Sequence, residues 1–422
     1  MQKTLLMMLA LLLVAAWGCK KDDEPAVGVV SGVITDAVSN AALANTRIIV
    51  FESNANVPVK SLTTGADGAY RTELLPGSYY LRLYRQGYEQ VPPKGMSPMP
   101  FTVSVGSEVI KPYEMNQSEV LNGGTISGKV LEGGKGVAGV LVVADRENKG
   151  YSAVSDAEGN FFIYNLPAGS YGLKGWVAGY SSEEQSVAVI SAAETAQNLQ
   201  LTRGAAGSVT GTITFLATNA VEVDVTLTHP LTQEPVPGLL TSTTAAYTIA
   251  NVPAGTYLAR ATYRNDDRVV DPDWIVKNGE PMVLVSSGAV TRNFSLTGAA
   301  KVVNPTNLAT TTEPIEIGGT TPTFSWQAYP SASDYVVEVS DANGNVIWGG
   351  IDRSGVLPAK RMVIASSQTS IQYNADGKAT RPLEPGKVYR WRVFVSKNDT
   401  STTGWRLISV SEDQMGLFRI AN

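Results

Sequence analysis

The stretch LPAGSYGLKGWVAGY, at residues 166–180, has two relatives in the same chain. LPGSYYLRLYRQGY lies at residues 75–88, and VPAGTYLARATYRN lies at residues 252–265. In each copy, Pro and Gly form a turn, and the Tyr that follows begins a run whose alternate residues face a core. The repeat therefore predicts that each copy closes one small β-sandwich.

The sequence around each copy follows the same order of short strands. The second unit opens with the period-two run GTISGKVLE at residues 124–132 and closes with TAQNLQLTR at residues 195–203. Such runs are rich in Val, Ile, Thr and Tyr, and Gly, Pro, Asn and Asp interrupt them, which is typical of antiparallel strands. Asp67-Gly68 and Glu158-Gly159 supply the positive φ that a hairpin needs. We therefore expect an all-β chain.

The second unit also carries the clearest family signature. SGKV at residues 127–130, followed by SDAEGNFFIYNLPAGSYGLKGWVAGY at residues 155–180, resembles the carboxypeptidase regulatory-like domain. That family is a transthyretin-like, seven-stranded β-sandwich and also belongs with the starch-binding-like sandwiches. The resemblance covers three copies and is weakest in the third, which lacks the Asp-Gly hairpin. It implies tandem antiparallel sandwiches of the Ig-like or transthyretin-like type, which we place at residues 27–115, 124–203 and 208–299.

The last part of the chain has a different pattern. TPTFSWQAYPSASDYVVEVS, followed by LEPGKVYRWRVFV, resembles a fibronectin type III domain, which we place at residues 305–422. The resemblance implies that Trp326 and Tyr335 lie in the core and that Tyr389 forms a tyrosine corner.

The first residues are typical of an exported chain. An unbroken apolar run from Leu5 to Ala16 is followed by small residues around Cys19, which is the layout of a secretory signal. AAWGC resembles a bacterial lipobox, which implies that residues 1–18 are a signal peptide and that Cys19 is lipidated. The acidic tether at residues 19–26 contains KKDDE, which resembles the export tag of surface lipoproteins; a solvated charge run is the alternative. We therefore expect an outer-membrane lipoprotein that faces the cell exterior.

Few residues suited to catalysis are present. The chain has one His, His229, so a two-histidine zinc site cannot be assembled. It has no Gly-x-Ser-x-Gly elbow of a serine hydrolase, for which His229 would be the only available base. A phosphate-binding glycine loop is missing, and the formal net charge is -5 without a basic stripe. The 38 acidic residues leave a carboxylate pair for glycoside hydrolysis open, although small sandwiches rarely enclose a deep cleft. We expect no enzyme activity, no metal, no cofactor and no nucleic-acid partner.

Alternation assigns the two faces of the strand GSYYLRLY. Tyr79 lies in phase with two leucines, so its face is expected to be the core. The opposite face carries Tyr80, Arg82 and Tyr84, and the same register turns Trp176 outward in the second copy. Exposed aromatic rings can stack on sugars, although a neighbouring domain could equally cover this face. These four side chains are therefore candidates for ligand binding.

Three further tryptophans are candidates for exposed binding platforms. Trp274 lies in DPDWIV, Trp348 follows the turn DANGN, and Trp405 lies in STTGWRL. Other aromatic residues are in phase with buried aliphatic residues and are expected in the cores, namely Tyr79, Tyr171, Tyr257, Trp326, Tyr335, Tyr389 and Trp391.

These observations favour a non-catalytic surface protein that binds carbohydrate. The alternative is a structural spacer, or an adhesion module for another surface protein, that holds a partner away from the outer membrane. Four domains in line, each about 35 Å across, would reach about 130 Å. Carbohydrate binding requires exposed aromatic residues near polar groups, whereas a spacer requires featureless faces and tight joints. The lipid anchor would make the membrane a partner in either case.

Overall fold

The computed structural model describes residues 26–53, 57–93, 98–120, 122–204, 206–216, 218–262, 267–307, 313–342, 344–412 and 415–421. The expected signal peptide and Cys19 lie outside the described residues. The described part of the chain contains no helix with the length and apolar character that a bilayer crossing requires.

Units 1 to 3 share one plan, in which two sheets pack face to face. Unit 1 comprises β1 (Gly28–Asp36), β2 (Arg47–Glu52), β3 (Val57–Thr63), β4 (Ala69–Leu74), β5 (Gly77–Tyr84), β6 (Phe101–Val103), β7 (Glu108–Ile110) and β8 (Tyr113–Met115). One sheet has the order β4-β1-β7, with β8 also paired to β1, and the other has the order β3-β2-β5-β6. The late strands β7 and β8 run parallel to β1, while the remaining pairs are antiparallel.

Unit 2 repeats this plan. It comprises β9 (Gly124–Glu132), β10 (Lys135–Gly136), β11 (Leu141–Arg146), β12 (Lys149–Val154), β13 (Asn160–Leu166), β14 (Gly169–Trp176), β15 (Tyr180–Ser182), β16 (Gln185–Val189), β17 (Glu194–Ala196) and β18 (Leu199–Arg203). Strand β9 is antiparallel to β13 and parallel to β17 and β18, and the second sheet has the order β12-β11-β14-β16.

Unit 3 follows the same plan with a short helix inserted. It comprises β19 (Gly207–Phe215), β20 (Val223–Thr228), β21 (Pro235–Thr243), β22 (Ala246–Val252), β23 (Gly255–Thr262), β24 (Arg268–Val270), α2 (Pro272–Asn278), β25 (Met282–Val285), β26 (Ala289–Thr291) and β27 (Phe294–Gly298). Its sheets have the orders β22-β19-β27-β24 and β21-β20-β23-β25.

Unit 4 is a different sandwich. It comprises β28 (Val302–Asn304), β29 (Ile315–Ile317), β30 (Thr323–Trp326), β31 (Asp334–Asp341), β32 (Val346–Gly349), β33 (Ile351–Asp352), β34 (Ala359–Lys360), β35 (Ile364–Ala365), β36 (Ser370–Gln372), β37 (Val388–Asn398), β38 (Trp405–Val410) and β39 (Leu417–Ile420). Its larger sheet has the order β29-β39-β37-β31-β32, and the smaller one β28-β30-β36. The backbone N–H of Glu384 donates to the Tyr389 hydroxyl at 3.0 Å, as expected of a tyrosine corner.

A hydrogen bond from a tyrosine hydroxyl explains why the turn-and-tyrosine motif recurs in units 1 to 3. In each copy the hydroxyl donates a hydrogen bond to the backbone carbonyl four residues earlier, across the Pro-Gly turn. The distances are 2.9 Å for Tyr79, 2.7 Å for Tyr171 and 2.8 Å for Tyr257. Each ring therefore closes its turn while it packs into the core. The seven aromatic side chains expected in the cores are all buried, with 7% or less exposed.

One glycine position also recurs, near the middle of the first strand of each unit. A Cβ added at Gly32, Gly128 or Gly211 would lie only 2.1, 1.9 and 1.9 Å from a backbone carbonyl oxygen of a late segment of the same unit. In unit 2 that oxygen belongs to Gln197. Glycine is therefore required for the close approach of the late, parallel strands to the first strand.

Gly128→Ala is expected to destabilise unit 2 by at least about 1–3 kcal/mol, because the new methyl group overlaps backbone that cannot move aside. Gly318→Ala is the matched control, since a Cβ there meets nothing within 4 Å. Urea unfolding monitored by tryptophan fluorescence provides the comparison. Equal midpoints for the two variants would contradict the close approach.

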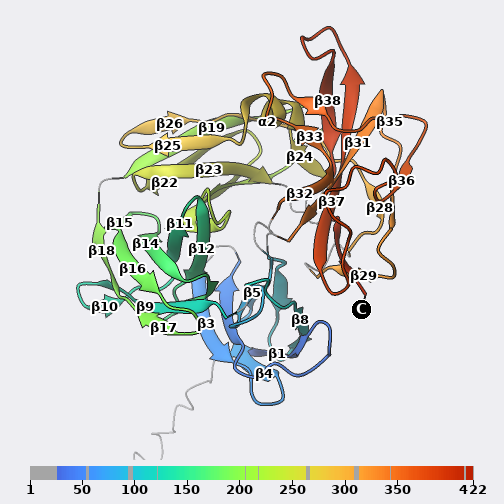
Figure 1. Ribbon diagram of the computed structural model, residues 1–422. Helices are drawn as coiled ribbons and strands as arrows, with labels where there is room; N and C mark the ends of the chain where they lie inside the picture. Colours follow the sequence, from blue (N-terminus) through green and yellow to red (C-terminus); the bar gives the residue numbers. More distant parts are fainter. Residues whose placement is uncertain are drawn as a thin grey trace, which may run out of the picture.

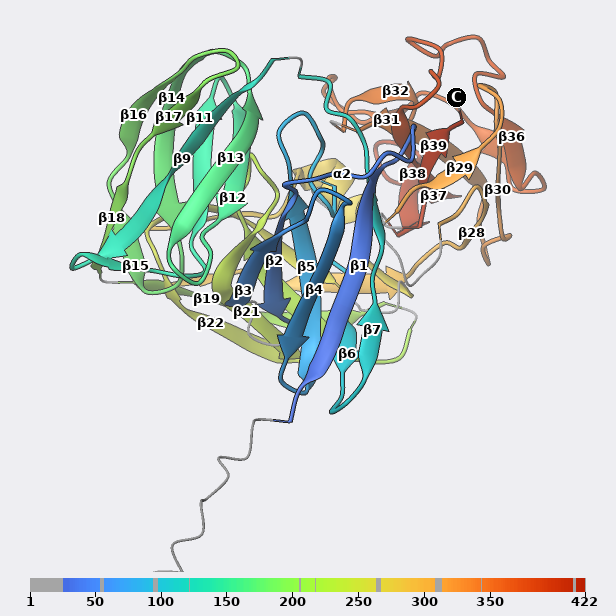
Figure 2. The ribbon, with the colours of Figure 1, turned by 90° about the horizontal axis from the view of Figure 1, so that it is seen from below.

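The four units do not lie in line. Figure 1 shows the four units around a common centre, and Figure 2 shows unit 1 between unit 2 and unit 4. Ion pairs join unit 1 to each of the other units, namely Arg47 with Asp156 of unit 2, Arg82 with Glu234 of unit 3, and Glu114 with Arg419 of unit 4. The chain thus folds back on itself after unit 3, and a long rod does not form.

Candidate functional site

The outer face of β5 is buried at the joint between units 1 and 3. Tyr80, Arg82 and Tyr84 are 5%, 3% and 7% exposed, and the two tyrosines join the apolar cluster that forms the core of unit 3. Arg82 pairs with Glu234, which also accepts a hydrogen bond from Gln90 at 2.6 Å. Burial lowers the pKa of Arg82, but the Glu234 carboxylate outweighs this effect and holds that pKa above its ordinary value.

The expectation that Tyr80, Arg82 and Tyr84 face solvent is therefore wrong. The predicted alternation is correct, because Tyr79 and its two neighbouring leucines lie in the core of unit 1. The error arises because a second unit covers the opposite face. These side chains hold units 1 and 3 together, and Tyr84 also lines the cavity described below.

Trp176 lies at the joint between units 2 and 3. Its ring packs edge-on against Tyr257, with a centroid distance of 5.6 Å, and lies 5.2 Å from the ring of His229. Lys174 lies over the same ring at 4.7 Å. The outward direction predicted for Trp176 is correct, but unit 3 covers most of the ring, so the expected exposed platform is wrong.

The three tryptophans expected on the surface have different environments. Trp348 is only 1% exposed, and its indole N–H donates to Asp376 at 2.7 Å, so the expectation of an exposed Trp348 is wrong. Trp274 and Trp405 are half-buried, and each has a cation over its ring, Arg292 at 5.2 Å and Lys360 at 4.8 Å. None of the three lines the cavity described next.

A cavity of about 640 Å³ lies where all four units meet, and we call it the central cleft. Its size is within the range of about 300–1,000 Å³ that is typical of ligand sites. Its tyrosines are Tyr84, Tyr88, Tyr151 and Tyr164. Its charged and amide side chains include Arg85, Glu89, Gln90, Glu119, Asn148, Lys149, Asn165 and Glu234. Unit 4 completes the lining with Ala342 and Asn345.

The joint between units 1 and 2 fixes Tyr88 at the edge of the central cleft. Its hydroxyl donates to the Asp36 carboxylate at 2.9 Å. Asn165 of unit 2 accepts from the Gly87 N–H and donates to the Tyr88 carbonyl, both at 2.7 Å. Burial raises the pKa of Asp36, but hydrogen bonds from the Ser39 backbone and other donors, including Tyr88, bring it well below the usual range. Asp36 is therefore an ionised acceptor that holds the ring in one orientation.

Tyr151 and Tyr164 come from unit 2 and are half-buried. Tyr151 packs edge-on against Tyr171 at 6.0 Å, and Tyr164 stacks with Phe162 at 6.2 Å. Rings supported in this way lose little conformational freedom when a ligand binds. They combine an apolar face with a polar hydroxyl, which suits the apolar faces and hydroxyl groups of a sugar ring.

The charged groups of the central cleft are of both signs. Burial raises the pKa of Glu89. A hydrogen bond from Ser118 lowers this pKa, and the neighbouring Glu119 carboxylate raises it, so that the pKa stays above its ordinary value. Arg85 and Lys149 supply positive charges to the same lining. This mixture favours a neutral ligand with many hydroxyl groups over a strongly charged one. Across the described ranges, no group of three His, Cys, Asp or Glu residues is placed to hold a metal ion.

Sequence reasoning identified only Tyr84 among the four cleft tyrosines. Tyr164 could have been found by alternation in FFIYNL, because Phe161 and Ile163 face the core, which turns Phe162 and Tyr164 outward. Tyr88 is the last residue of the repeated motif in unit 1, LPGSYYLRLYRQGY. No local pattern indicated that these residues from different units would meet.

Comparisons with known proteins agree with this architecture. The carboxypeptidase regulatory-like domain family matches residues 29–106 and 125–202, which lie in units 1 and 2. The Rha78A-like, N-terminal immunoglobulin domain family matches residues 304–419, which confirms an Ig-like sandwich in unit 4. No curated protein matches the chain significantly.

Several solved structures are similar at low TM-score. The Bacillus anthracis TIE protein is 16% identical at a TM-score of 0.19, covering 64% of this chain and 51% of its own. BcpA, the major pilin subunit of Bacillus cereus, is 14% identical at a TM-score of 0.19, and the match covers 64% of this chain and 99% of BcpA. The shaft pilin SpaA of Lactobacillus rhamnosus GG is 10% identical at a TM-score of 0.19, and the match covers 42% of this chain and 98% of SpaA. The chain thus spans about half the length of the first of these proteins.

Proposed function

From a chain built of carboxypeptidase regulatory-like domains and an Ig-like domain, we propose a non-catalytic, lipid-anchored surface protein that binds a glycan in the central cleft. The observation that carries the proposal is the convergence of four tyrosines and many hydrogen-bonding side chains on one cavity. The anchor is proposed from the lipobox-like sequence around Cys19 alone.

The arrangement of the units supports binding over spacing. A spacer of four units in line would place a partner about 130 Å from its anchor, whereas the chain returns unit 4 to unit 1. The joints leave a cavity of about 640 Å³ at the centre of the molecule. A chain that served only to span distance would have no need of such a cavity.

Tyr164→Ala is expected to weaken glycan binding by about fivefold or more, because a stacking ring is worth about 1 kcal/mol or more at a site shielded from water. The measurement is a glycan array on the purified protein, followed by titration of the best ligand against the variant. Tyr180→Ala is the matched control, since Tyr180 is also half-buried in unit 2 but does not line the cleft. Failure of every glycan to bind, or equal losses in both variants, would reject the cleft.

Cys19→Ser is expected to abolish acyl labelling and to release the protein from membranes, since the lipidation that a lipobox implies requires the cysteine thiol. Metabolic labelling with a fatty-acid probe and membrane fractionation measure the two effects. Labelling that persists in the variant would contradict the anchor without affecting the proposal for the cleft.

A further inference from the structure

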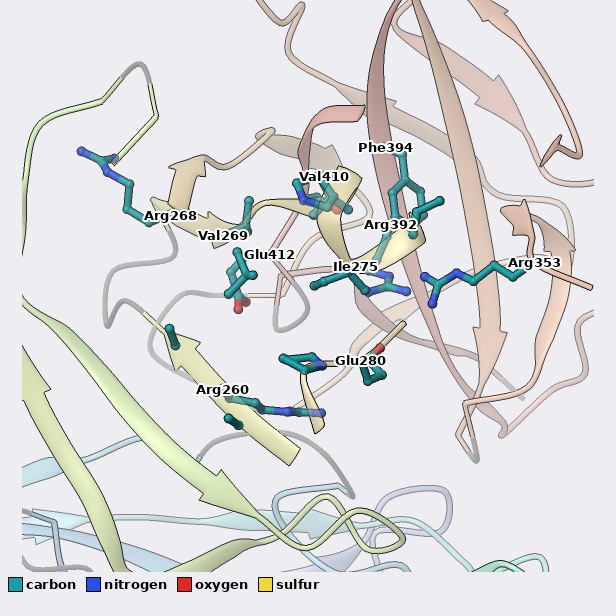
Figure 3. Close-up of a pocket in the computed structure, with 17 residues that line it drawn as sticks. Arg260, Arg268, Val269, Ile275, Glu280, Arg353, Arg392, Phe394, Val410 and Glu412 are labelled. Atoms are coloured by element: carbon teal, nitrogen blue, oxygen red, sulfur yellow. The ribbon is translucent and has the colours of Figure 1, made fainter. Parts of the chain in front are cut away.

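A second, smaller cavity of about 180 Å³ lies between units 3 and 4, and we call it the arginine pocket. Figure 3 shows the side chains that line it. Arg260 and Arg268 come from unit 3, and Arg353 and Arg392 come from unit 4. Its lining contains four arginines and no lysine. The central cleft lies elsewhere, and the two cavities share no lining residue.

Neighbouring groups hold three of the arginines in place. Arg260 donates to the side-chain oxygen of Gln233 at 2.9 Å, and Arg268 donates to the carbonyl of Asp267 at 3.0 Å. Arg392 pairs with Glu338 at 2.7 Å. These contacts fix the positions of the guanidinium groups before any ligand arrives, which lowers the entropic cost of binding.

Arg353 lies differently, in the exposed loop between β33 and β34. In Figure 3 its guanidinium group points toward that of Arg392, next to Ile275. Two like charges that face one cavity repel each other unless an anion lies near both. Glu338 already pairs with Arg392, so an incoming anion on the unit 4 side would mainly compensate the charge of Arg353.

The rest of the arginine pocket is mostly apolar. Val269, Ile275, Val276, Phe394 and Val410 contribute to its lining, and Glu280 and Glu412 are its only acidic members. Arg353 and Arg392 lie on the unit 4 side of the pocket, whereas Arg268 extends away from the other labelled side chains (Figure 3). An apolar surface beside planar guanidinium groups suits a ligand with an organic body and an anionic head.

We propose that the arginine pocket binds a small organic carboxylate. Arginine presents a planar fork of donors that matches the two oxygens of a carboxylate, and the exclusive use of arginine over lysine favours such a planar anion. The carboxylate lies against Arg353 and Arg392, and the body of the ligand lies against Ile275 and Phe394. The small volume limits the ligand to one residue-sized group, such as a uronic acid unit of an acidic glycan or a free organic acid.

Ligand-observed NMR titration of the purified protein tests this site with three probes. Galacturonate carries the carboxylate on a sugar ring, galactose is its neutral counterpart, and succinate is a carboxylate without a sugar. We expect galacturonate to bind more tightly than galactose, and Arg353→Gln to weaken galacturonate binding about tenfold, as the loss of a charge-assisted hydrogen bond requires. Arg361→Gln is the control, because Arg361 is also an exposed arginine in unit 4 but does not line the pocket.

Each outcome decides the proposal. Tighter binding of galacturonate than of succinate supports an acidic sugar, and equal binding of the two supports a free organic acid at the same site. Failure of both acids to bind, or equal affinity of the wild type and Arg353→Gln for them, overturns the site. Because galactose and Tyr164→Ala report on the central cleft, failure of the arginine pocket can be distinguished from failure of the proposed glycan site.

Discussion

Arg82→Ala is expected to lower the free energy of unfolding by about 3–5 kcal/mol, because it leaves the Glu234 carboxylate buried without its cation. The loss should appear in the transition that includes units 1 and 3, since the pair joins those two units. Differential scanning calorimetry and urea unfolding both measure it.

A double variant separates the cost of an unpaired charge from the value of the ion pair. Arg82→Met combined with Glu234→Leu removes both charges and keeps apolar volume, so it is expected to recover most of the loss. The control pair is Arg71 with Glu108, whose side chains are 61% and 51% exposed, so water screens their attraction and the pair is expected to contribute little to stability. If Arg82→Ala has no larger effect than Arg71→Ala, the buried joint between units 1 and 3 is refuted.

Tyr80→Ala is expected to cost about 3–5 kcal/mol, as much as Tyr79→Ala, although the two side chains point to opposite faces of β5. Tyr79 packs in the core of unit 1, whereas Tyr80 packs in the cluster shared with unit 3 and stacks on Phe51 at a centroid distance of 4.9 Å. An outer face in solvent would give a change of about 0.5 kcal/mol or less. Urea midpoints of the two variants measured side by side make the comparison, and a small effect of Tyr80→Ala alone would place that face in water.

The sequence predicted each unit better than it predicted their assembly. The recurring turn and tyrosine are local features, and period-two alternation correctly turned Tyr79 inward and Trp176 outward. Burial of the outer face depends on contacts between distant segments, as between Arg82 and Glu234, which lie 152 residues apart. A single sequence contains no pattern that pairs two such residues.

The environment of Trp348 could not be predicted for a related reason. Its strand VIWG has Ile347 and Trp348 both buried, so alternation between a core face and a solvent face does not apply. Trp348 packs near Phe324 and against Tyr373, which belong to a different part of unit 4. Tyr373 lies between residues 352 and 380, a stretch that is longer and less regular than in most fibronectin type III domains.

The closure of four units around a central cleft is the basis of the proposed function, and small-angle X-ray scattering tests it most directly. For the protein without residues 1–25, a compact arrangement predicts a radius of gyration near about 22 Å. Four units in line would form a rod of about 130 Å with a radius of gyration near about 38 Å. A value near the first agrees with the closed assembly, and a value near the second would contradict it.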